Sequence, residues 1–443
     1  MTGTQAGYRF GLWTLVALVV GNAIGAGIYT TSGFSLASLG ARHWVLLAWV
    51  VAGLVALCGA LSYGMLAARL RESGGEYLYL HRAIHPLAGF IAGWISLLAG
   101  FPGAIAFAAT ALESYARAAS AAMQTLPQDS LAVFVTIGAG SIHIIRVKAG
   151  AIIHEWVVAG MLAALAIVII WSGFAYLESE ELPIVARDGV ATFNLFAFAS
   201  SLVWISLSYS GFNAAAYVAG EVRDTVKNVP RGMVIGTLIT LLLCVLLNAI
   251  MLYSAPIEAL SGQAEIAAIS AQALGGVQAR RVIELVIALS LLTSITAMAL
   301  AGPRVYAKMA EDGALPRLFK AKAGEPPRAS IALQVVVSLA LILVADLREL
   351  LSYLGLTLSL CLALAVSSLF VIHWRTGERP DSIWYPVAPL IFVLCTVLFS
   401  ALSALHDPRQ FYAVAPTVMM GCVAYFFHLR RQRPPLGNGS RNV

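Results

Sequence analysis

The first long apolar segment of the chain is interrupted by the stretch Gly21-Asn22-Ala23-Ile24-Gly25-Ala26-Gly27-Ile28-Tyr29. Glycine costs about 1 kcal/mol relative to alanine inside a helix, and three glycines fall within seven residues here. We therefore expect this helix to unwind locally. Close helix packing is the alternative interpretation, because Gly21 and Gly25 also form a GxxxG pair.

A second interruption lies in the apolar segment near residues 194–221. It reads Ser206-Leu207-Ser208-Tyr209-Ser210-Gly211-Phe212-Asn213-Ala214. The two segments are the first and sixth spans of the chain, which are equivalent positions if spans 1–5 and 6–10 are inverted repeats. Paired interruptions at equivalent positions are the best sequence indication of a transporter's substrate site.

The composition is that of a membrane protein. Of the 443 residues, 60% are hydrophobic and 11% are charged, whereas soluble proteins carry about 25% charged residues. A water-facing surface cannot be built from this sequence, which excludes soluble enzymes, nucleic-acid-binding proteins and disordered scaffolds. The five cysteines are scattered singly, so we expect buried thiols, no disulfide, no metal site and no cofactor. The first segment lacks the features of a cleaved signal peptide, and we interpret it as retained.

Apolar runs of about 20 residues predict membrane-spanning helices. The sequence predicts an all-α protein with twelve such spans, near residues 12–36, 43–68, 84–111, 131–147, 150–175, 194–221, 231–254, 280–309, 330–346, 350–373, 384–404 and 410–429. The loops between them are short. One transmembrane domain over residues 1–443 is therefore expected.

The basic residues are distributed unequally between the two sides of the predicted spans. One side, which includes both termini and the tail 430–443, holds 21 of the 28 Lys and Arg residues. The positive-inside rule then predicts that both termini are cytoplasmic, in the plasma (inner) membrane. This asymmetry explains the net charge of +6 as a result of topology, so membrane lipid and no nucleic acid is expected as a partner.

The interrupted backbone predicts the chemistry of the site. Unwinding frees amides at Gly25, Ala26 and Gly27 at the start of a half-helix, which favours an anion such as a carboxylate. Freed carbonyls near residues 23–24 and 208–209 can accept hydrogen bonds from an ammonium group. A site that holds both charges without charged side chains suits an amino acid.

Several stretches resemble the amino acid–polyamine–organocation (APC) permease family. Besides the two interruptions they are Glu72-Ser73-Gly74-Gly75-Glu76-Tyr77-Leu78-Tyr79, Gly220-Glu221-Val222, Asn228-Val229-Pro230-Arg231, Gly302-Pro303-Arg304-Val305-Tyr306 and Met309-Ala310-Glu311-Asp312-Gly313-Ala314-Leu315-Pro316. Each motif is moderately specific, but their order along the chain is a strong signal.

The resemblance implies a five-plus-five inverted repeat of the LeuT type, over about residues 12–175 and 194–373, with extra helices over about 384–429. It also implies alternating access, with Gly25, Ala26 and Gly27 at the substrate carboxylate and carbonyls of spans one and six at the amine. Leu207 falls where many relatives have an aromatic gate residue. Asn213 is similar to the asparagine of large-neutral-amino-acid exchangers, although an interhelical hydrogen bond is its alternative role.

The resemblance leaves the coupling mechanism open. Met161 falls at the position of an intramembrane lysine in many relatives, so lysine-based proton coupling does not carry over. His154 and Glu155, at the start of that span, are the candidates for proton coupling; the alternative is that both lie solvated and uninvolved at the cytoplasmic interface. Ser294, in span eight, is a candidate for lining a cation site, but hydroxyls of this span could instead bond within their own helix.

The sequence thus predicts a secondary active transporter, a permease or exchanger of neutral L-amino acids, acting as a monomer or homodimer. Exchange or proton-linked uptake is expected over sodium coupling. An antiporter of basic amino acids or polyamines is the alternative, although Asn213 offers no acid for such a substrate. An integral membrane enzyme or an ion channel is less well supported, because neither a catalytic cluster nor a filter motif is visible.

Overall fold

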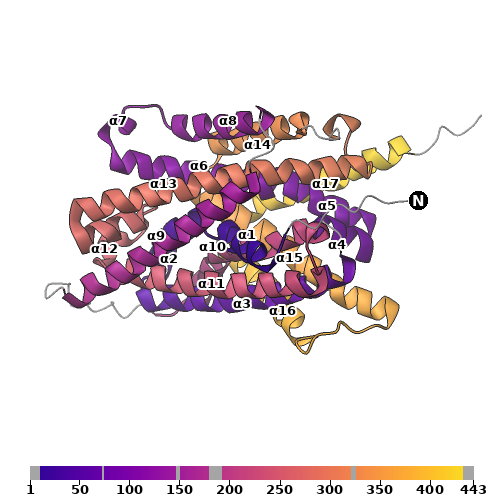
Figure 1. Ribbon diagram of the computed structural model, residues 1–443, viewed down its shortest axis with the longest axis horizontal. Coiled ribbons are helices and arrows are strands. Elements are labelled where there is room, and N and C mark those ends of the chain that lie inside the picture. The colour runs from indigo at the N-terminus through magenta and orange to yellow at the C-terminus, as the bar shows by residue number, and fades with distance from the viewer. Residues whose placement is uncertain (1–9, 72–73, 146–149, 179–191, 321–325, 433–443) are drawn as a thin grey trace, which may run out of the picture.

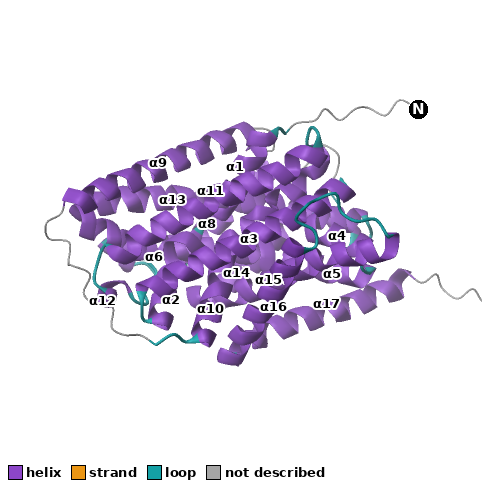
Figure 2. Cartoon of the chain, turned by 90° about the horizontal axis from the view of Figure 1, so that it is seen from below, coloured by secondary structure: helices purple, strands orange, loops and turns teal. Residues whose placement is uncertain are grey.

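The computed structural model describes residues 10–71, 74–145, 150–178, 192–320 and 326–432. Within these ranges the chain is helical and forms no strand, apart from one isolated bridge between Phe10 and Val222. Figure 2 shows the helices running along a common direction, with loops mainly at their ends. The all-α class expected from the sequence is therefore observed.

The described residues of the first half of the bundle form ten helices. They are α1 (Leu12–Ala23), α2 (Ala26–Leu39), α3 (Arg42–Leu70), α4 (Gly75–Ala83), α5 (Pro86–Ile95), the π-helix η1 (Ser96–Gly100), α6 (Phe101–Ala119), α7 (Ala121–Gln124), α8 (Ser130–Ile145) and α9 (Gly150–Glu178).

The second half begins with a helix that changes type. Its elements are α10 (Leu195–Tyr209), the 3-10 helix η2 (Ser210–Glu221), α11 (Thr225–Tyr253), α12 (Ile257–Leu260), α13 (Ile266–Glu311), the 3-10 helix η3 (Arg317–Phe319), α14 (Arg328–Val344), α15 (Leu347–Thr376), α16 (Val387–His406), the 3-10 helix η4 (Pro408–Gln410) and α17 (Phe411–Gln432).

One boundary differs clearly from the sequence prediction. A span was expected to begin near residue 280, but α13 begins at Ile266. Gly275 and Gly276 have non-helical backbone angles inside α13, so two helical pieces meet there at a kink. The apolar pattern marks only the second piece, which explains the later start predicted from hydropathy.

Eight of the described helices, or helices joined end to end, are long and apolar enough to cross a membrane. Four shorter apolar helices accompany them, at Ser130–Ile144, Ala159–Phe174, Arg328–Val344 and Val414–Phe427. Large apolar side chains such as Leu394 and Phe426 are exposed on the outside of the bundle. An apolar exterior of this kind is what lipid, rather than water, solvates.

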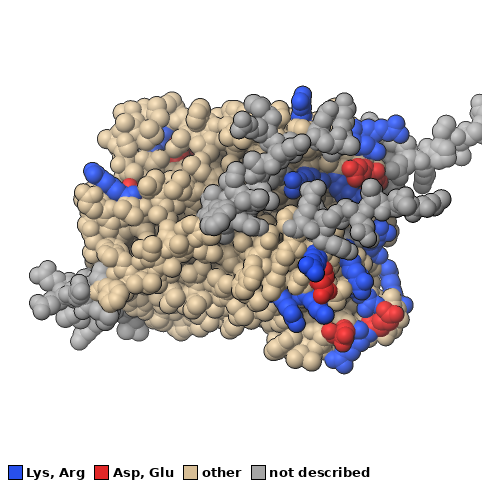
Figure 3. Space-filling model, viewed as in Figure 1, with Lys and Arg blue, Asp and Glu red and all other residues tan. Residues whose placement is uncertain are grey.

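Charge is concentrated at the ends of the bundle. Figure 3 shows most of the visible Lys and Arg side chains at the end that holds α4, and a broad uncharged band between the two ends. At the α4 end, Arg375 donates to the carbonyl of Ala83 at 2.9 Å, and Arg69 pairs with Glu378 at 2.6 Å. This distribution matches a molecule whose middle lies in hydrocarbon.

The interior of the bundle positions the two interrupted segments. Helix α1 lies within the bundle, packed against α11 and η2 (Figure 1). Its side chains Leu15, Val19 and Val20 are fully buried. The N-terminal half of the first span is therefore held on several sides before the chain reaches its break.

Candidate functional site

The first span is broken at Ile24 and Gly25. Helix α1 ends at Ala23, and α2 begins at Ala26. Ile24 has ψ near 85° and Gly25 is extended, with φ −131° and ψ −159°, so neither continues the helix. The Gly25 amide donates to the Ala23 carbonyl at 3.0 Å instead of to a carbonyl one helical turn back.

The amides of Ala26 and Gly27 open helix α2. The first amides of a helix have no carbonyl partner within that helix, and this end carries the positive part of the helix dipole. Ile24, Ala26 and Gly27 are all buried. A helix start of this kind is electrostatically more favourable for an anionic group than for a cationic one.

The sixth span changes its helix type at the predicted interruption. The α-helical part ends at Tyr209, and a 3-10 helix continues from Ser210. The Leu207 carbonyl accepts hydrogen bonds from the Ser210 amide and, at 2.7 Å, from the Ser210 hydroxyl. Leu207 itself is half-buried. The Tyr209 hydroxyl donates to the carbonyl of Trp49 at 3.1 Å, which fixes this ring to α3.

The two interruptions meet in space. A Cβ on Gly211 would overlap the backbone of Asn22 and Ala23, and a Cβ on Gly27 would overlap the hydroxyl of Ser208. The Ser208 Oγ is buried and has no hydrogen-bond partner among the described residues. Residues 23–27 and 207–211 therefore form one continuous region, in which glycine allows the two backbones to approach closely.

Two further helices border this region. The Ser294 hydroxyl of α13 would lie 3.5 Å from a Cβ built on Gly25, so Ser294 lies beside the break as its candidacy requires. Its neighbours Thr293 and Thr296 donate to carbonyls of their own helix, at 2.8 and 3.0 Å, as the alternative reading expects. In α9, Met161 accepts a hydrogen bond on sulfur from Ser290, at 3.2 Å.

Asn213 has a different environment from the one expected for a substrate contact. Its amide nitrogen donates to the Glu76 carboxylate at 2.6 Å and to the Tyr217 hydroxyl at 3.2 Å. The interhelical hydrogen bond considered as an alternative role is thus present. Glu76 lies in the motif of residues 72–79, and the sequence alone predicts no role for it. The available signal was an acid directly after the glycines of residues 74–75.

The structure describes the backbone of the two proposed coupling residues in the fifth span. His154 and Glu155 fall within α9, but their side chains lie outside the described residues. Their roles therefore stay predictions from the sequence.

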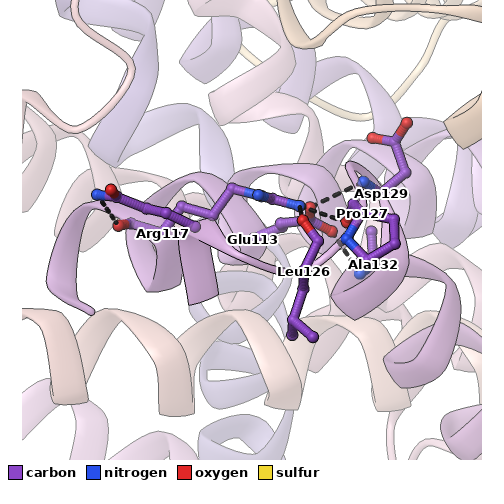
Figure 4. Close-up of polar contacts among 7 residues, drawn as sticks. Glu113, Arg117, Leu126, Pro127, Asp129 and Ala132 are labelled. Carbon is purple, nitrogen blue, oxygen red and sulfur yellow. Dashed lines mark hydrogen bonds and ion pairs between the residues drawn. The ribbon is translucent and has the colours of Figure 1, made fainter. Parts of the chain in front are cut away.

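Glu113 is a buried carboxylate at the end of the bundle opposite α4. Figure 4 shows it accepting hydrogen bonds from Arg117 and from the Asp129 and Ala132 amides, at 2.7, 2.8 and 2.9 Å. Glu113 and Arg117 form the ion pair that a four-residue spacing within one helix predicts. Burial, and then the nearby charge of Glu113, raise the pKa of the Asp129 carboxyl, while Arg117 opposes that rise. The cluster fixes the start of α8 to α6.

Comparison with known proteins adds evidence on the whole chain. The family model described as "Amino acid permease" matches residues 10–426. The rabbit (Oryctolagus cuniculus) large neutral amino acids transporter small subunit 2 is 25% identical over 446 residues, covering 96% of this chain and 81% of that protein.

Two further relatives have names that state different specificities. The mouse (Mus musculus) b(0,+)-type amino acid transporter 1 is 22% identical, covering 94% of this chain and 87% of that protein. The serine/threonine exchanger SteT of Bacillus subtilis (strain 168) is 23% identical, covering 87% and 88%. The family match spans both interrupted segments and nearly all described helices, and the chain belongs to the amino acid permease family, of the APC type that its motifs resemble.

Proposed function

We propose that this protein is a secondary active transporter of neutral L-amino acids that works by alternating access. The observation that carries the proposal is the meeting of two interrupted spans, at Gly211 against Ala23 and at Gly27 against Ser208. Neither interruption, residues 21–29 or 206–214, contains a charged side chain. A zwitterion bound there has to be recognised by backbone groups and by neutral polar side chains.

The binding mode follows from the ends of the half-helices. The substrate carboxylate takes the amides of Ala26 and Gly27, where the dipole of α2 is favourable, and the Gly25 amide joins them by exchanging its bond to the Ala23 carbonyl for the ligand. The ammonium group takes carbonyls of residues 23–24 and 208–209, and the Ser208 hydroxyl lies close to Gly27. Inside a membrane, such a ligand also satisfies backbone groups that would otherwise lack partners.

The proposed architecture is a twelve-span, five-plus-five inverted repeat with interrupted first and sixth spans. The eight long helices and four shorter apolar helices together supply twelve candidates. The repeats cover about residues 12–175 and 194–373, followed by two extra helices over about 384–429. The excess of Lys and Arg on one side supports cytoplasmic termini.

The names of the relatives support transport rather than catalysis. They include large neutral amino acid, b(0,+)-type and serine/threonine proteins. We favour neutral substrates, because the two interruptions offer no acid to pair with a cationic side chain. A basic amino-acid or polyamine antiporter is the second candidate, supported by the b(0,+)-type relatives.

Transport by exchange or by proton-linked uptake is proposed over sodium coupling. Met161 offers no charged nitrogen where many relatives carry lysine, and it contacts Ser290 on α13 instead. His154, Glu155 and Ser294 are the coupling candidates that the sequence identifies. The assembly is proposed as a monomer or homodimer.

The proposal is tested with purified protein in liposomes preloaded with each of the twenty amino acids in turn. Labelled neutral amino acids should exchange with the internal pool, and the same substrates should raise the melting temperature in detergent. If only a polyamine or arginine moves and stabilises the protein, the neutral substrate class is wrong. Movement of ions without any substrate would favour a channel.

A further inference from the structure

Glu76 is a buried carboxylate that has no cationic partner within the described part of the chain. Its residue is 4% exposed, and it lies in the first turn of α4, the short helix between the second and third spans. Among the residues that the structure describes, no Lys, Arg or His comes within 4.0 Å of its oxygens. Its charge is therefore balanced only by hydrogen bonds.

Three side chains donate to this carboxylate. The Tyr63 hydroxyl and the Asn213 amide reach Oε1 at 2.9 and 2.6 Å, and the Tyr217 hydroxyl reaches Oε2 at 2.7 Å. Tyr63 belongs to α3, whereas Asn213 and Tyr217 both belong to η2. Two of the three donors thus come from the 3-10 half of the interrupted sixth span.

The turn before Glu76 brings α4 against η2. Gly74 and Gly75 both have positive φ, +150° and +53°, a region that favours glycine. A Cβ on Gly75 would overlap the ring of Tyr217. The motif glycines therefore allow the close approach that places the carboxylate beside its donors.

Four titratable side chains among the described residues interact with the Glu76 carboxylate. They are Tyr63 on α3, Tyr79 on α4, Tyr217 on η2 and Cys361 on α15. Phenols and thiols ordinarily ionise only in alkaline solution, so none of these four side chains offers Glu76 a positive charge.

The contacts of η2 therefore control how well Glu76 holds its charge. Hydrogen bonds to the ionised form favour that form, whereas burial disfavours it. If η2 moves away, the carboxylate loses two of its three donors while α3 and α4 still enclose it. A buried carboxylate that loses its donors is neutralised by taking up a proton.

We propose that Glu76 is a proton-binding site coupled to the position of η2. With η2 docked, as in this structure, the Glu76 carboxyl group accepts three hydrogen bonds; with η2 displaced, it binds one proton from water. Because coupling between two equilibria is reciprocal, low pH favours the displaced position. The role of this site in transport rests on the proposed function, but the proton binding itself does not.

Amide hydrogen exchange of residues 210–221 in detergent tests the proton binding directly. After correction for intrinsic rates, the wild type should exchange faster at mildly acidic pH than at neutral pH. Glu76→Gln, which cannot ionise, should remove this pH dependence. The matched control is Glu284→Gln, whose carboxylate pairs with Arg280 at 2.7 Å, and it should respond to pH as the wild type does.

A second variant covers the case in which Glu76→Gln fails to fold. Tyr63→Phe removes one donor and leaves the donors on η2 in place, so the midpoint of the pH response should rise by roughly one pH unit, since one hydrogen bond to a charged group is lost. The proposal is overturned if Glu76→Gln keeps the wild-type pH response, if the wild type shows none, or if Tyr63→Phe leaves the midpoint unchanged.

Transport measurements separate this inference from the proposed function. Glu76→Gln in liposomes should exchange neutral amino acids at equal pH on both sides, but a pH gradient should no longer stimulate uptake. If the wild type moves no amino acid while the exchange of residues 210–221 still depends on Glu76, the proposed function fails and the proton site stands. Wild-type stimulation by the gradient in Glu76→Gln would overturn the role of the site in transport and leave the proposed transport function intact.

Discussion

Gly211 lies directly against the backbone of Ala23, at the point where the 3-10 half of the sixth span crosses the break in the first span. The contact is between two main chains, so no side-chain rotation can widen it. This crossing places the start of α2 and the end of α10 in one region. The proposed substrate site depends on it.

Gly211→Ala should therefore abolish transport and lower the melting temperature, because the new methyl group overlaps the amide of Ala23. Gly160→Ala is the matched control, since a Cβ there would meet nothing within 4 Å. Exchange in liposomes and thermal unfolding in detergent measure both effects. Normal exchange by Gly211→Ala would show that the two spans are not held in this contact during transport.

Gly25→Val should abolish transport while the protein still inserts and folds. A Cβ at this position would contact the Ser294 hydroxyl at an ordinary 3.5 Å, so the fold has room for it, but the branched side chain blocks the approach of a carboxylate to the amides of residues 25–27. Substrate-induced thermal stabilisation should disappear together with uptake. Normal uptake by this variant is incompatible with the proposed binding mode.

Asn213→Asp should destabilise the protein in a pH-dependent way. The new carboxylate would lie where the amide now contacts Glu76 at 2.6 Å, and two carboxylates this close cannot both ionise readily. The loss of melting temperature should be large at neutral pH and shrink at acidic pH, where the pair holds a proton. Asn213→Leu, which removes one donor to Glu76 but adds no second carboxylate, should lose less melting temperature at neutral pH than Asn213→Asp does. A loss for Asn213→Asp that is independent of pH would contradict the contact.

Glu113→Gln should lower the free energy of unfolding by about 2 kcal/mol or more, because hydrogen bonds from a charged partner and from two amides are weakened at a buried site. Arg117, Asp129 and Ala132 supply these bonds. Transport should persist, since the cluster lies outside the interrupted segments. Denaturant unfolding measures the change. Glu349→Gln is the control, because glutamine also serves in the capping box that Glu349 forms with Asp346.

Local sequence predicted the two interruptions because their cause is local. Glycine and polar residues weaken a helix wherever they occur, and the break at Ile24–Gly25 and the change to a 3-10 helix after Tyr209 fall inside the predicted stretches. Helices likewise lie at the predicted apolar ranges, with the early start of α13 as the clear exception. Hydropathy could not locate that start, because it follows a kink at Gly275 and Gly276.

The partners of the site residues could not be predicted in this way. Asn213 and Glu76 are 137 positions apart, and no periodicity relates them. The neutral amide of Asn213 suggested a substrate contact, whereas its actual environment includes a buried carboxylate. Glu76 is a candidate proton-binding site because Tyr63, Asn213 and Tyr217 converge on it, and only the fold brings these residues together.

The sequence by itself determined that the chain is an apolar helical membrane protein with two weakened spans and a basic excess on one side, since composition and local helix propensity fix these properties. Only the tertiary structure decided that Gly211 meets Ala23, that Gly27 meets Ser208 and that Glu76 receives three donors. These contacts arise from the packing of segments distant in sequence, and packing depends on the shapes of all the helices together.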